Sequence, residues 1–393
     1  MHKILIMTNF PQQIKEWYKI HGRQLPWRET KDPYKIWISE VILQQTRVSQ
    51  GLEYYRRFIR AFPNVIALAK ASETKLMQQW QGLGYYSRVR NLQHAAQTIV
   101  SEYNGDIPQT YKKIRTLKGI GPYTASAIAS FAFDLPYAVV DGNVYRILSR
   151  FYAKELPIDS SIGQKYFATL AQDLLNKQDP ATHNQAMMDL GALICKPANP
   201  LCEECPVNQT CAANSTGTQK NFPIKIKKTK RRKRYLNYFI LKSSTHIIIN
   251  KRNKKDIWQG LFQFPLIETP EPTTKQEIRR LLEASFKTPF ELTVILEKKH
   301  LLTHQELLVR FLKINLSSEI DFSNPEKIYS KEAFRNLQNN ILLSEHKSIV
   351  SEEQANVYPN PADCYLTVSI KKIEDVPFPQ IIKENLRLLL TPL

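Results

Sequence analysis

Long apolar runs are missing from this chain of 393 residues. A helix that crosses a membrane needs roughly 18 consecutive apolar residues, and no stretch of the sequence approaches that length. The N-terminus, MHKILIMTNF, has an apolar run of only four residues and no small-residue cleavage site, so it is not typical of a signal peptide. We therefore expect a cytoplasmic protein without membrane association.

Acidic residues are also scarce. The sequence has 36 Asp and Glu against 55 Lys and Arg, which leaves a formal net charge of +19. Such an excess makes a polyanion the first partner to consider, although a basic composition alone is a weak signal. A nucleic-acid partner would place the protein at the nucleoid. At this length the chain can form two or three domains, each with its own core.

Cysteine occurs only five times, and four of the five fall within 17 residues: Cys195, Cys202, Cys205 and Cys211. The fifth, Cys364, stands far away and is interpreted as an ordinary thiol. Clustering in a reducing compartment favours a metal over disulfides. Four thiolates at the spacing C-x6-C-x2-C-x5-C can surround zinc or a four-iron cubane. Zinc ribbons usually have two C-x2-C pairs, and this spacing has only one.

Strand-like alternation is absent before residue 213, so the sequence predicts an all-α first domain over residues 1–212. The expected helices lie at residues 9–30, 33–48, 51–62, 73–80, 88–103, 160–176 and 183–194, with two more starting at Pro122 and after Asp141. Residues 213–234 form a basic linker that ends in KIKKTKRRKR. This linker can lie along phosphates or can simply be solvated.

Alternating patterns begin at residue 235 and predict an α+β second domain over 235–393. Five strand patterns are interrupted by one amphipathic helix at about 275–286. Residues 317–365 are polar and irregular, and we interpret them as an insertion. The chain closes with the pattern of a strand and a final helix.

The helix that opens with Asp32 and Pro33 has almost no polar side. Glu40 is its single carboxylate, between Ile36 and Leu43 on a helical projection. Burial should raise the pKa of Glu40, which would keep it protonated and able to donate near neutrality. The alternative is a buried glutamate that is satisfied by a structural arginine.

A Gly-x-Gly bend precedes another helix. Gly119 and Gly121 are followed by Pro122, which is favourable at a first helical position. Free backbone N–H groups and the helix dipole at such a bend can hold a phosphate. Asp141 comes twenty residues after Gly121, directly before a further helix. Alternatively, the glycines only turn the chain and Asp141 only caps a helix.

Seven motifs occur in order: LPWRE, ISEVILQQT, GLGYY, LKGIGPYTA, VDGN, NQAMMDLG and the four-cysteine loop. Together they cover most of residues 20–211 and resemble the adenine DNA glycosylases of the helix-hairpin-helix superfamily that includes endonuclease III. Residues 235–393 resemble the Nudix-like domain of that family more loosely. The resemblance implies a monomer with a [4Fe–4S] cluster on the cysteine loop at 195–211. It also implies removal of adenine opposite 8-oxoguanine or guanine in double-stranded DNA.

The resemblance assigns roles to single residues. Glu40 would protonate the adenine, Asp141 would face the sugar and Asn143 would support Asp141. A helix N-terminus should lower the pKa of Asp141 while burial raises that of Glu40. The hairpin with Gly119 and Gly121 would grip the DNA backbone. The remaining assignments are Gln45 and Tyr85 in the DNA stack, and Trp27, Arg28, Gln185 and Met188 around the extruded base.

Two departures from the family pattern matter. Tyr123 stands where bifunctional relatives carry a lysine nucleophile, so base removal should occur without efficient strand cleavage. Leu302, Thr303 and His304 stand where the family often shows Phe-Ser-His against 8-oxoguanine. Thr303 keeps a hydrogen-bonding hydroxyl, but the aromatic ring is lost, and His304 can equally be an ordinary surface histidine.

Other functions remain as alternatives. A glycosylase for thymine or uracil opposite guanine would use the same fold. A non-catalytic DNA-binding iron–sulfur protein would not need both Glu40 and Asp141. A pyrophosphate hydrolase is disfavoured, because IRRLLEASF after Gly260 lacks the acidic cluster that would bind magnesium.

Overall fold

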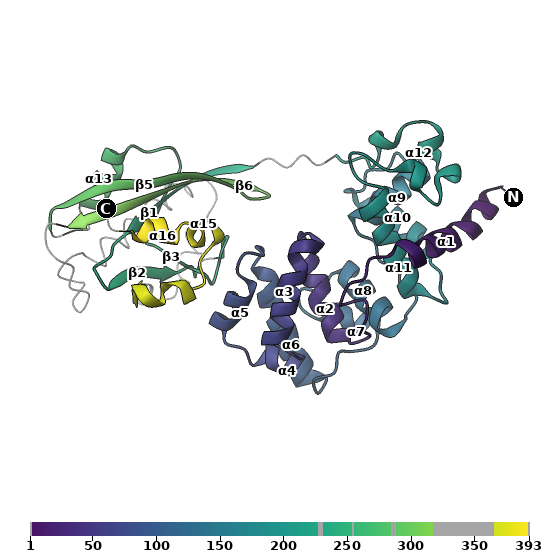
Figure 1. Cartoon of the computed structure of the whole chain (residues 1–393), viewed down its shortest axis with the longest axis horizontal. Coiled ribbons are helices and arrows are strands. Elements are labelled where there is room, and N and C mark those ends of the chain that lie inside the picture. The colour runs from purple at the N-terminus through teal and green to yellow at the C-terminus, as the bar shows by residue number, and fades with distance from the viewer. Residues whose placement is uncertain are drawn as a thin grey trace, which may run out of the picture. The chain divides into compact units, whose positions relative to one another are not determined.

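The computed structural model describes residues 2–226, 231–253, 255–283, 286, 288–316 and 365–391. The chain divides into two compact units (Figure 1). The first combines residues 1–72 with 87–228, and the second combines residues 73–86 with 229–393. None of the helices in the described part of the chain is long and apolar enough to span a membrane.

The first unit is helical throughout its described residues, as the sequence predicts. Its longer helices are α1 (His2–His21), α2 (Pro33–Leu43), α3 (Val48–Ala61), α6 (Ser87–Glu102), α8 (Pro122–Phe133), α9 (Gly142–Phe151), α10 (Ser161–Leu174) and α11 (Pro180–Asp189). Its short turns are α4 (Val65–Ala69), α7 (Tyr111–Thr116), η1 (Leu190–Ile194), η2 (Cys202–Glu204), η3 (Asn208–Thr210), α12 (Ala212–Ser215) and η4 (Gln219–Asn221).

Helix α1 ends at His21, so the prediction of a helix up to residue 30 is wrong. The chain leaves the helix at Gly22, whose N–H donates to the carbonyl oxygen of Tyr18 at 2.8 Å. A Cβ atom at Gly22 would lie 2.6 Å from that same oxygen, so only glycine fits this exit. The extended segment that follows carries Trp27 and Arg28 to the start of α2.

Helix α2 forms where the sequence predicts it. The Asp32 side chain accepts from the backbone N–H of Tyr34 at 2.9 Å, and Pro33 takes the first helical position. Eight of its eleven residues are buried, because α2 packs against both α3 and α8. The single carboxylate of α2 is therefore held inside the unit.

A second group of helices, α1, α9, α10 and α11, encloses an apolar core of this unit. Phe10, Ile14, Leu148 and Phe167 are almost completely buried in it. Cys195, Cys205 and Cys211 pack against the same core as half-buried side chains. The cysteine loop is thus anchored to the helix that follows Asp141.

The second unit contains two sheets, as expected for an α+β domain (Figure 1). One sheet has the order β4 (Leu266–Thr269), β1 (Arg232–Ile240), β6 (Gln305–Leu316) and β5 (Phe290–Leu301). The other has the order β3 (Phe262–Gln263), β2 (His246–Lys251) and β7 (Tyr365–Ser369). Strands β1 and β6 are parallel, whereas β5 and β6 form an antiparallel hairpin.

Helices complete this unit. Helix α13 (Lys275–Glu283) buries Ile278 and Leu282 against the larger sheet. Helix α5 (Glu73–Trp80) groups with this unit, and the chain ends with η8 (Ile370–Asp375), α15 (Gln380–Lys383) and α16 (Leu386–Leu390). For the C-terminal end, the sequence pattern predicted a strand and one final helix. The strand is β7, and the residues after it form a 3₁₀ turn and two short helices. Residues 317–364, almost all of the predicted insertion, lie outside the described residues.

Strand β1 starts at Arg232, inside the stretch that the sequence assigned to an exposed linker. Arg234 is only 7% exposed. Its guanidinium donates to the carboxylates of Asp256, at 2.7 and 2.9 Å, and Glu268, at 2.6 Å. A buried charge is tolerated when it is paired and hydrogen-bonded, so the end of the basic run belongs to the sheet.

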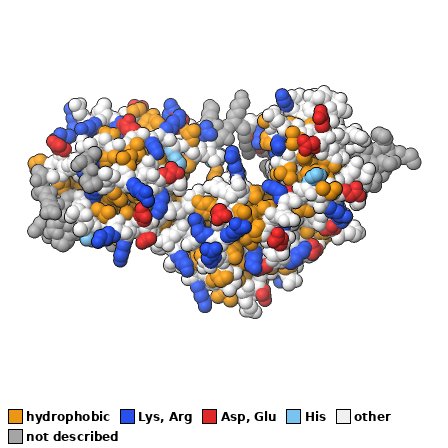
Figure 2. Space-filling model, in the orientation of Figure 1, with side chains coloured by type: hydrophobic (Ala, Val, Ile, Leu, Met, Phe, Trp, Pro, Cys, Tyr) orange, Lys and Arg blue, Asp and Glu red, His pale blue; other side chains and the backbone are white. Residues whose placement is uncertain are grey.

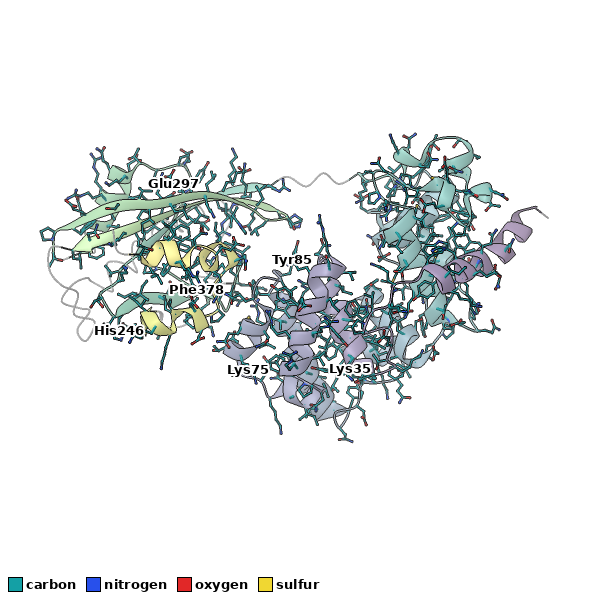
Figure 3. The ribbon with its side chains drawn as sticks, viewed as in Figure 1. Lys35, Lys75, Tyr85, His246, Glu297 and Phe378 are labelled. Carbon is teal, nitrogen blue, oxygen red and sulfur yellow. The ribbon has the colours of Figure 1, made fainter. Side chains whose placement is uncertain are left out.

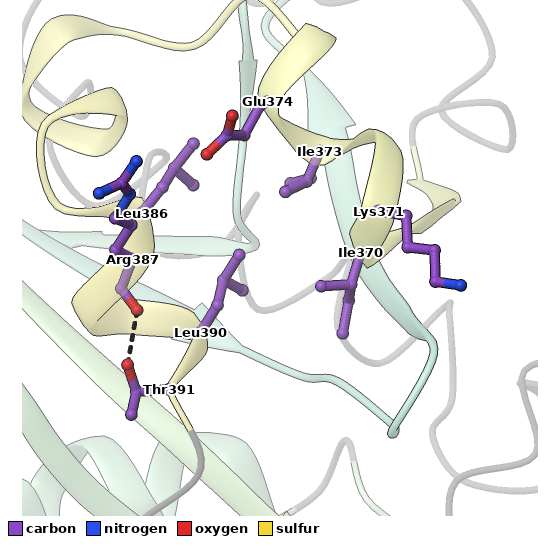
Figure 4. A pocket seen from close by; sticks show the side chains of 8 residues that line it. All are labelled: Ile370, Lys371, Ile373, Glu374, Leu386, Arg387, Leu390 and Thr391. Carbon is purple, nitrogen blue, oxygen red and sulfur yellow. Dashed lines mark hydrogen bonds between the residues drawn. The ribbon is translucent and has the colours of Figure 1, made fainter.

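The surface of the described residues carries basic side chains and a pocket. Lys and Arg side chains are spread over the visible face of both units (Figure 2). A pocket of about 440 Å³ opens in the second unit between η8 and α16 (Figure 4). Its lining residues are Ile370, Lys371, Ile373, Glu374, Leu386, Arg387, Leu390 and Thr391. None of the residues that the sequence singled out belongs to it.

Candidate active site

Glu40 lies inside the first unit with 4% of its surface exposed. The phenolic O–H of Tyr123 donates to its Oε2 at 2.7 Å. Burial raises the pKa of Glu40 to about 7, although the Tyr123 hydrogen bond and the charge of Arg28 both act to lower it. The prediction of a raised pKa is therefore confirmed. Glu40 is a carboxyl group that can hold a proton near neutrality.

Asp141 caps helix α9. Its Oδ1 accepts from the backbone N–H groups of Asn143 and Val144 at 2.9 and 2.8 Å, and its Oδ2 accepts from the Asn143 amide at 2.7 Å. These bonds lower the pKa of Asp141, but desolvation outweighs them and the net direction is upward. The expectation of a lowered pKa for Asp141 is therefore wrong in its net direction, because the cap is half-buried rather than solvated. Asp141 is close enough to Glu40 for its charge to raise the pKa of Glu40.

Arg146 holds Asn143 in place. Its Nη2 donates to Asn143 Oδ1 at 2.8 Å and to the carbonyl oxygen of Gly191 at 2.7 Å, while its Nε donates to the carbonyl oxygen of Cys195 at 2.7 Å. The amide nitrogen of Asn143 is therefore directed at Asp141. Sequence reasoning missed Arg146, although its position one helical turn after Asn143 was a usable signal.

Gly191 lies against this arrangement. A Cβ atom there would be only 2.4 Å from the Cβ atom of Asn143. A larger residue would push the supporting amide away from Asp141. The glycine of the motif NQAMMDLG thus has a packing reason.

Arg28 is engaged inside the protein. Its guanidinium donates to the two carboxylate oxygens of Asp189 at 2.7 and 2.8 Å, and Arg23 donates to the same carboxylate. The side chain of Asp189 is completely buried. Arg28 and Asp189 thus form a bidentate, charge-assisted hydrogen-bonded pair, which is stronger than a pair of neutral groups. Arg28 also acts on the pKa of Glu40, which places it near the site. The sequence predicted Arg28 but not Asp189.

Helix α11 presents Gln185 and Met188 one turn apart, both half-buried. Met188 packs against the same apolar cluster as Tyr123. The Oε1 atom of Gln185 accepts from the hydroxyl of Tyr18 at 2.8 Å. Trp27 is buried edge-on against Tyr55, with ring centroids 5.2 Å apart.

The bend before α8 has the geometry of a phosphate site. Gly119 has a φ of 82°, and a Cβ atom there would lie 2.6 Å from Asn91 Cβ, so glycine is required. Gly121 is the N-cap of α8, and an added Cβ atom would meet nothing within 4 Å. Open space in front of a helix N-terminus, with its free N–H groups, suits a phosphate of DNA.

Gln45 and Tyr85 share an uncommon backbone conformation. Their φ angles are 61° and 46°, in the left-handed region that residues with a side chain rarely adopt. Both are exposed. Each such residue costs of order 1–3 kcal/mol and tends to occur where function requires it. The two residues assigned to the DNA stack are thus held in strained, outward conformations.

The four cysteines of the loop are all half-buried and form no disulfide with one another. Burial, with the charges of the other three cysteines, raises the pKa of Cys205 to about 12. Arg150 Nη1 lies 3.4 Å from Cys195 Sγ. Among the described residues no group of three or more such side chains has the arrangement of a formed metal site. The donor set itself fits a thiolate-ligated metal.

In the second unit, Thr303 and His304 lie exposed in the turn between β5 and β6. The hydroxyl of Thr303 contacts the hydroxyl of Tyr85, which is labelled in Figure 3. The carbonyl oxygen of His304 accepts from the N–H of Arg232 at 3.0 Å. Thr303 is therefore brought next to a residue that the sequence assigned separately to the DNA stack.

Comparisons with known proteins agree with this geometry. Residues 38–162 match the model of the HhH-GPD superfamily of base excision DNA repair proteins, and residues 237–388 match that of the NUDIX domain. An adenine DNA glycosylase of Buchnera aphidicola subsp. Baizongia pistaciae is 36% identical over 326 residues, which cover 81% of this chain and 89% of that protein. The chain belongs to the adenine DNA glycosylase family.

Two further matches cover about half of the chain. The adenine DNA glycosylase of Rattus norvegicus is 42% identical over 217 residues, which cover 53% of this chain and 42% of that protein. Among solved structures, a thermostable thymine-DNA glycosylase matches with a TM-score of 0.52 and 26% identity, covering 55% of this chain and all of that chain. This member of the adenine DNA glycosylase family is thus a base-excision repair enzyme with the helix-hairpin-helix glycosylase fold.

Proposed function

We propose that this enzyme removes adenine from double-stranded DNA in which adenine is opposite 8-oxoguanine or guanine. The observation that carries the proposal is the pair of carboxyl groups in the first unit. Glu40 is buried with a pKa of about 7, and Asp141 lies close enough to act on it electrostatically. One group can give a proton, and the other can face positive charge.

Glu40 acts as the general acid. Adenine is a poor leaving group as an anion, so protonation at N7 makes its departure possible. Tyr123 donates to Oε2 of Glu40, which leaves Oε1 as the oxygen that carries the transferable proton. Because its pKa lies near 7, a large share of the enzyme holds that proton at neutral pH.

Asp141 stabilises the sugar. Loss of the base leaves positive charge on C1′, and a carboxylate at that position stabilises it or adds to it briefly, as in retaining glycosidases. Asn143 and the first N–H groups of α9 hold the carboxylate in place. Water then attacks C1′, and the product is an abasic site. No lysine stands at position 123, so we propose that the enzyme does not cleave the strand.

The second unit reads the opposing base. Thr303 and His304 are exposed hydrogen-bonding groups in one turn, and discrimination of 8-oxoguanine from guanine needs polar groups against the edge that differs. We propose that Gln45 and Tyr85 enter the base stack and help to offset the cost of extrusion. Trp27, Arg28, Gln185 and Met188 surround the extruded adenine.

Cys195, Cys202, Cys205 and Cys211 would hold a [4Fe–4S] cluster, which supplies one-electron redox chemistry when bound. Arg146 and Arg150 tie this loop to α9 through the carbonyl oxygens of Cys195 and Lys196, both at 2.7 Å. Metal analysis of aerobically purified protein should find roughly four irons and negligible zinc. One stoichiometric zinc would contradict the assignment.

We further propose a glycosylase domain over residues 1–212, joined by a basic linker to a Nudix-like domain whose first strand starts at Arg232. The enzyme acts as a monomer on DNA, in the cytoplasm at the nucleoid. Its excess of 55 Lys and Arg over 36 Asp and Glu supplies the general affinity for a polyanion.

One experiment tests the proposed reaction. The protein is incubated with duplexes that carry A opposite 8-oxoguanine, A opposite G, T opposite G and U opposite G, and abasic sites and strand breaks are measured separately. Abasic sites are expected only in the two adenine duplexes, without strand breaks. Release of thymine would instead support the activity named for the structural neighbour. Replacing both Thr303 and His304 by alanine should reduce the preference for 8-oxoguanine over guanine.

A further inference from the structure

Tyr18 of α1 joins two elements that border the candidate active site. Its hydroxyl donates to Oε1 of Gln185 on α11 at 2.8 Å. The same hydroxyl lies 3.4 Å from Nη1 of Arg28, the guanidinium that is paired with Asp189. A chain of polar contacts thus runs from Asp189 through Arg28 and Tyr18 to the amide of Gln185.

The chemistry of these groups sets the direction of each hydrogen bond. A carboxylate only accepts and a guanidinium only donates, so Arg28 donates to Asp189 and to Tyr18. Burial raises the pKa of Tyr18, so its hydroxyl keeps its single proton. Because the Tyr18 oxygen receives from Arg28, its proton is available for an acceptor, and Oε1 of Gln185 is that acceptor. The Gln185 amide is therefore held with its oxygen toward Tyr18.

The other end of that amide is a donor without a partner among the residues that the structure describes. Gln185 is half-buried, one helical turn before Met188. Met188 packs against the same apolar cluster as Tyr123, which bonds to Glu40. Arg28, at the other end of this series of polar contacts, acts through its charge to lower the pKa of Glu40. Gln185 is therefore one helical turn from a side chain that shares a cluster with Tyr123, and its partner Tyr18 contacts an arginine whose charge acts on Glu40.

We propose that Tyr18 is a positioning residue for base selection, which fixes the Gln185 amide so that its NH₂ group donates to N1 of the extruded adenine. This inference rests on the proposed function. Glu40 is assigned to N7, and N1 on the opposite edge of the ring is a free acceptor in adenine. Hypoxanthine carries a hydrogen at N1. Its N1–H would therefore face the NH₂ group of Gln185, and two donors cannot form a hydrogen bond. An amide that cannot rotate rejects hypoxanthine, and one that can rotate accepts it.

The test compares single-turnover release of adenine and of hypoxanthine, each opposite guanine. Wild-type enzyme should release adenine much faster. In the Tyr18→Phe variant the ratio of the two rates should fall about tenfold, because the amide is free to turn its oxygen to the base. Gln185→Glu keeps an acceptor for Tyr18 but loses the donor, so its ratio should fall similarly. That variant tests the same donor if Tyr18→Phe does not fold.

A double-mutant cycle separates positioning from a general structural effect. With Gln185→Ala as the background, adding Tyr18→Phe should change the ratio less than twofold, since there is no amide left to hold. Tyr145→Phe is the matched control. It removes the hydroxyl of a tyrosine packed edge-on against Phe167 in the core, and its ratio should equal that of wild type.

Three results would overturn the inference: an unchanged ratio in an active Tyr18→Phe enzyme, an equal loss of both rates, or the same tenfold change in the Gln185→Ala background. A wild-type enzyme that releases no adenine would refute the proposed function and this inference together. The two failures are therefore distinguishable by the wild-type adenine rate alone.

Discussion

Two buried charged side chains, Glu40 in the first unit and Arg234 in the second, are held in opposite ways. In the first unit, Glu40 has a neutral hydrogen-bond donor, Tyr123, and no cation in direct contact among the described residues. In the second unit, Arg234 is bonded to Asp256 and Glu268, and Arg252 also donates to Asp256 at 2.9 Å. The charge that Glu40 carries when it is ionised is therefore not compensated by a bonded cation, whereas the charge of Arg234 is compensated by two carboxylates.

The consequence appears in the pKa values. Burial raises the pKa of Glu40 to about 7, whereas the arginines hold the pKa of Asp256 below its usual value despite burial. Glu40 changes its protonation near neutral pH and Asp256 does not. A buried carboxyl group that lacks a bonded cation costs stability. Its presence at such a position favours a catalytic role. The ion-pair network around Arg234 favours a structural role instead.

The strongest test of this contrast is Glu40→Gln. The amide keeps the shape of the side chain but has no proton to give, so the single-turnover rate of adenine release should fall roughly a thousandfold or more. Duplex affinity, measured separately, should change little. A rate within tenfold of wild type would remove Glu40 from the role of general acid.

The same variant also tests the cost of burial. The folded pKa of Glu40 is above its ordinary value of 4.5, so the unfolded chain loses this proton first as pH rises. The folded state is therefore destabilised between pH 4.5 and 7, by roughly 3 kcal/mol above pH 7. Glu40→Gln should raise the unfolding temperature relative to wild type at pH 8 but much less at pH 5. Equal shifts at both pH values would contradict the raised pKa.

Asp141→Asn should reduce the rate roughly a hundredfold to a thousandfold, because the negative charge that faces the sugar is lost. The cap should survive, since an asparagine oxygen also accepts from backbone N–H groups. Circular dichroism and the unfolding temperature serve as the check on folding. A large loss of stability with no separate loss of rate would make Asp141 a cap and nothing more.

Arg234→Met addresses the other side of the comparison. The substitution removes the cation that is bonded to Glu268 and leaves Asp256 with Arg252, so it should cost roughly 3 kcal/mol of unfolding free energy. The rate of adenine release opposite guanine should stay within twofold at temperatures where the variant is folded. Arg279→Met removes an exposed pair with Glu283 and is the matched control, with an expected cost near zero. A strong loss of catalytic rate in Arg234→Met would show that the network is not purely structural.

The smallest expected effect belongs to Tyr123→Phe. The hydrogen bond from Tyr123 lowers the pKa of Glu40, so its removal should raise that pKa further. Because the acid is active when protonated, the rate of adenine release falls as pH rises through the pKa, and this fall should move to higher pH. The ratio of rates at pH 8 and pH 6 should rise a few-fold in Tyr123→Phe and stay unchanged in Tyr145→Phe. A move to lower pH would mean that Tyr123 acts in another way.

Much of this site could be predicted from sequence because its signals are local. The apolar helix around Glu40, the bend at Gly119 and the spacing of the cysteines are each contained in a few residues. The partners of these groups are not local. Tyr18 and Gln185 are 167 positions apart, and Arg28 and Asp189 are 161 apart, so no periodic pattern connects them.

Other errors arose where two physical effects compete. Hydrogen bonds and desolvation pull the pKa of Asp141 in opposite directions, and only the folded surroundings decide the balance. Arg234 continues a run of basic residues that is typical of a linker, yet its carboxylate partners are Asp256, between β2 and β3, and Glu268 of β4. A glycine exit at Gly22 ended α1 before the aromatic pattern did.

The left-handed backbone at Gln45 and Tyr85 bears on how the enzyme searches for its target. A positive φ persists at a residue with a side chain only where the surrounding structure holds it, so the proposed insertion of these two side chains into the base stack needs no change of backbone conformation. On this proposal, no slow change of backbone separates the arrival of the enzyme at a base pair from the insertion of these side chains. An enzyme that passes very many ordinary pairs for each damaged one gains most from brief encounters. Replacement of either residue by glycine would relax the backbone and lengthen the time spent on undamaged DNA.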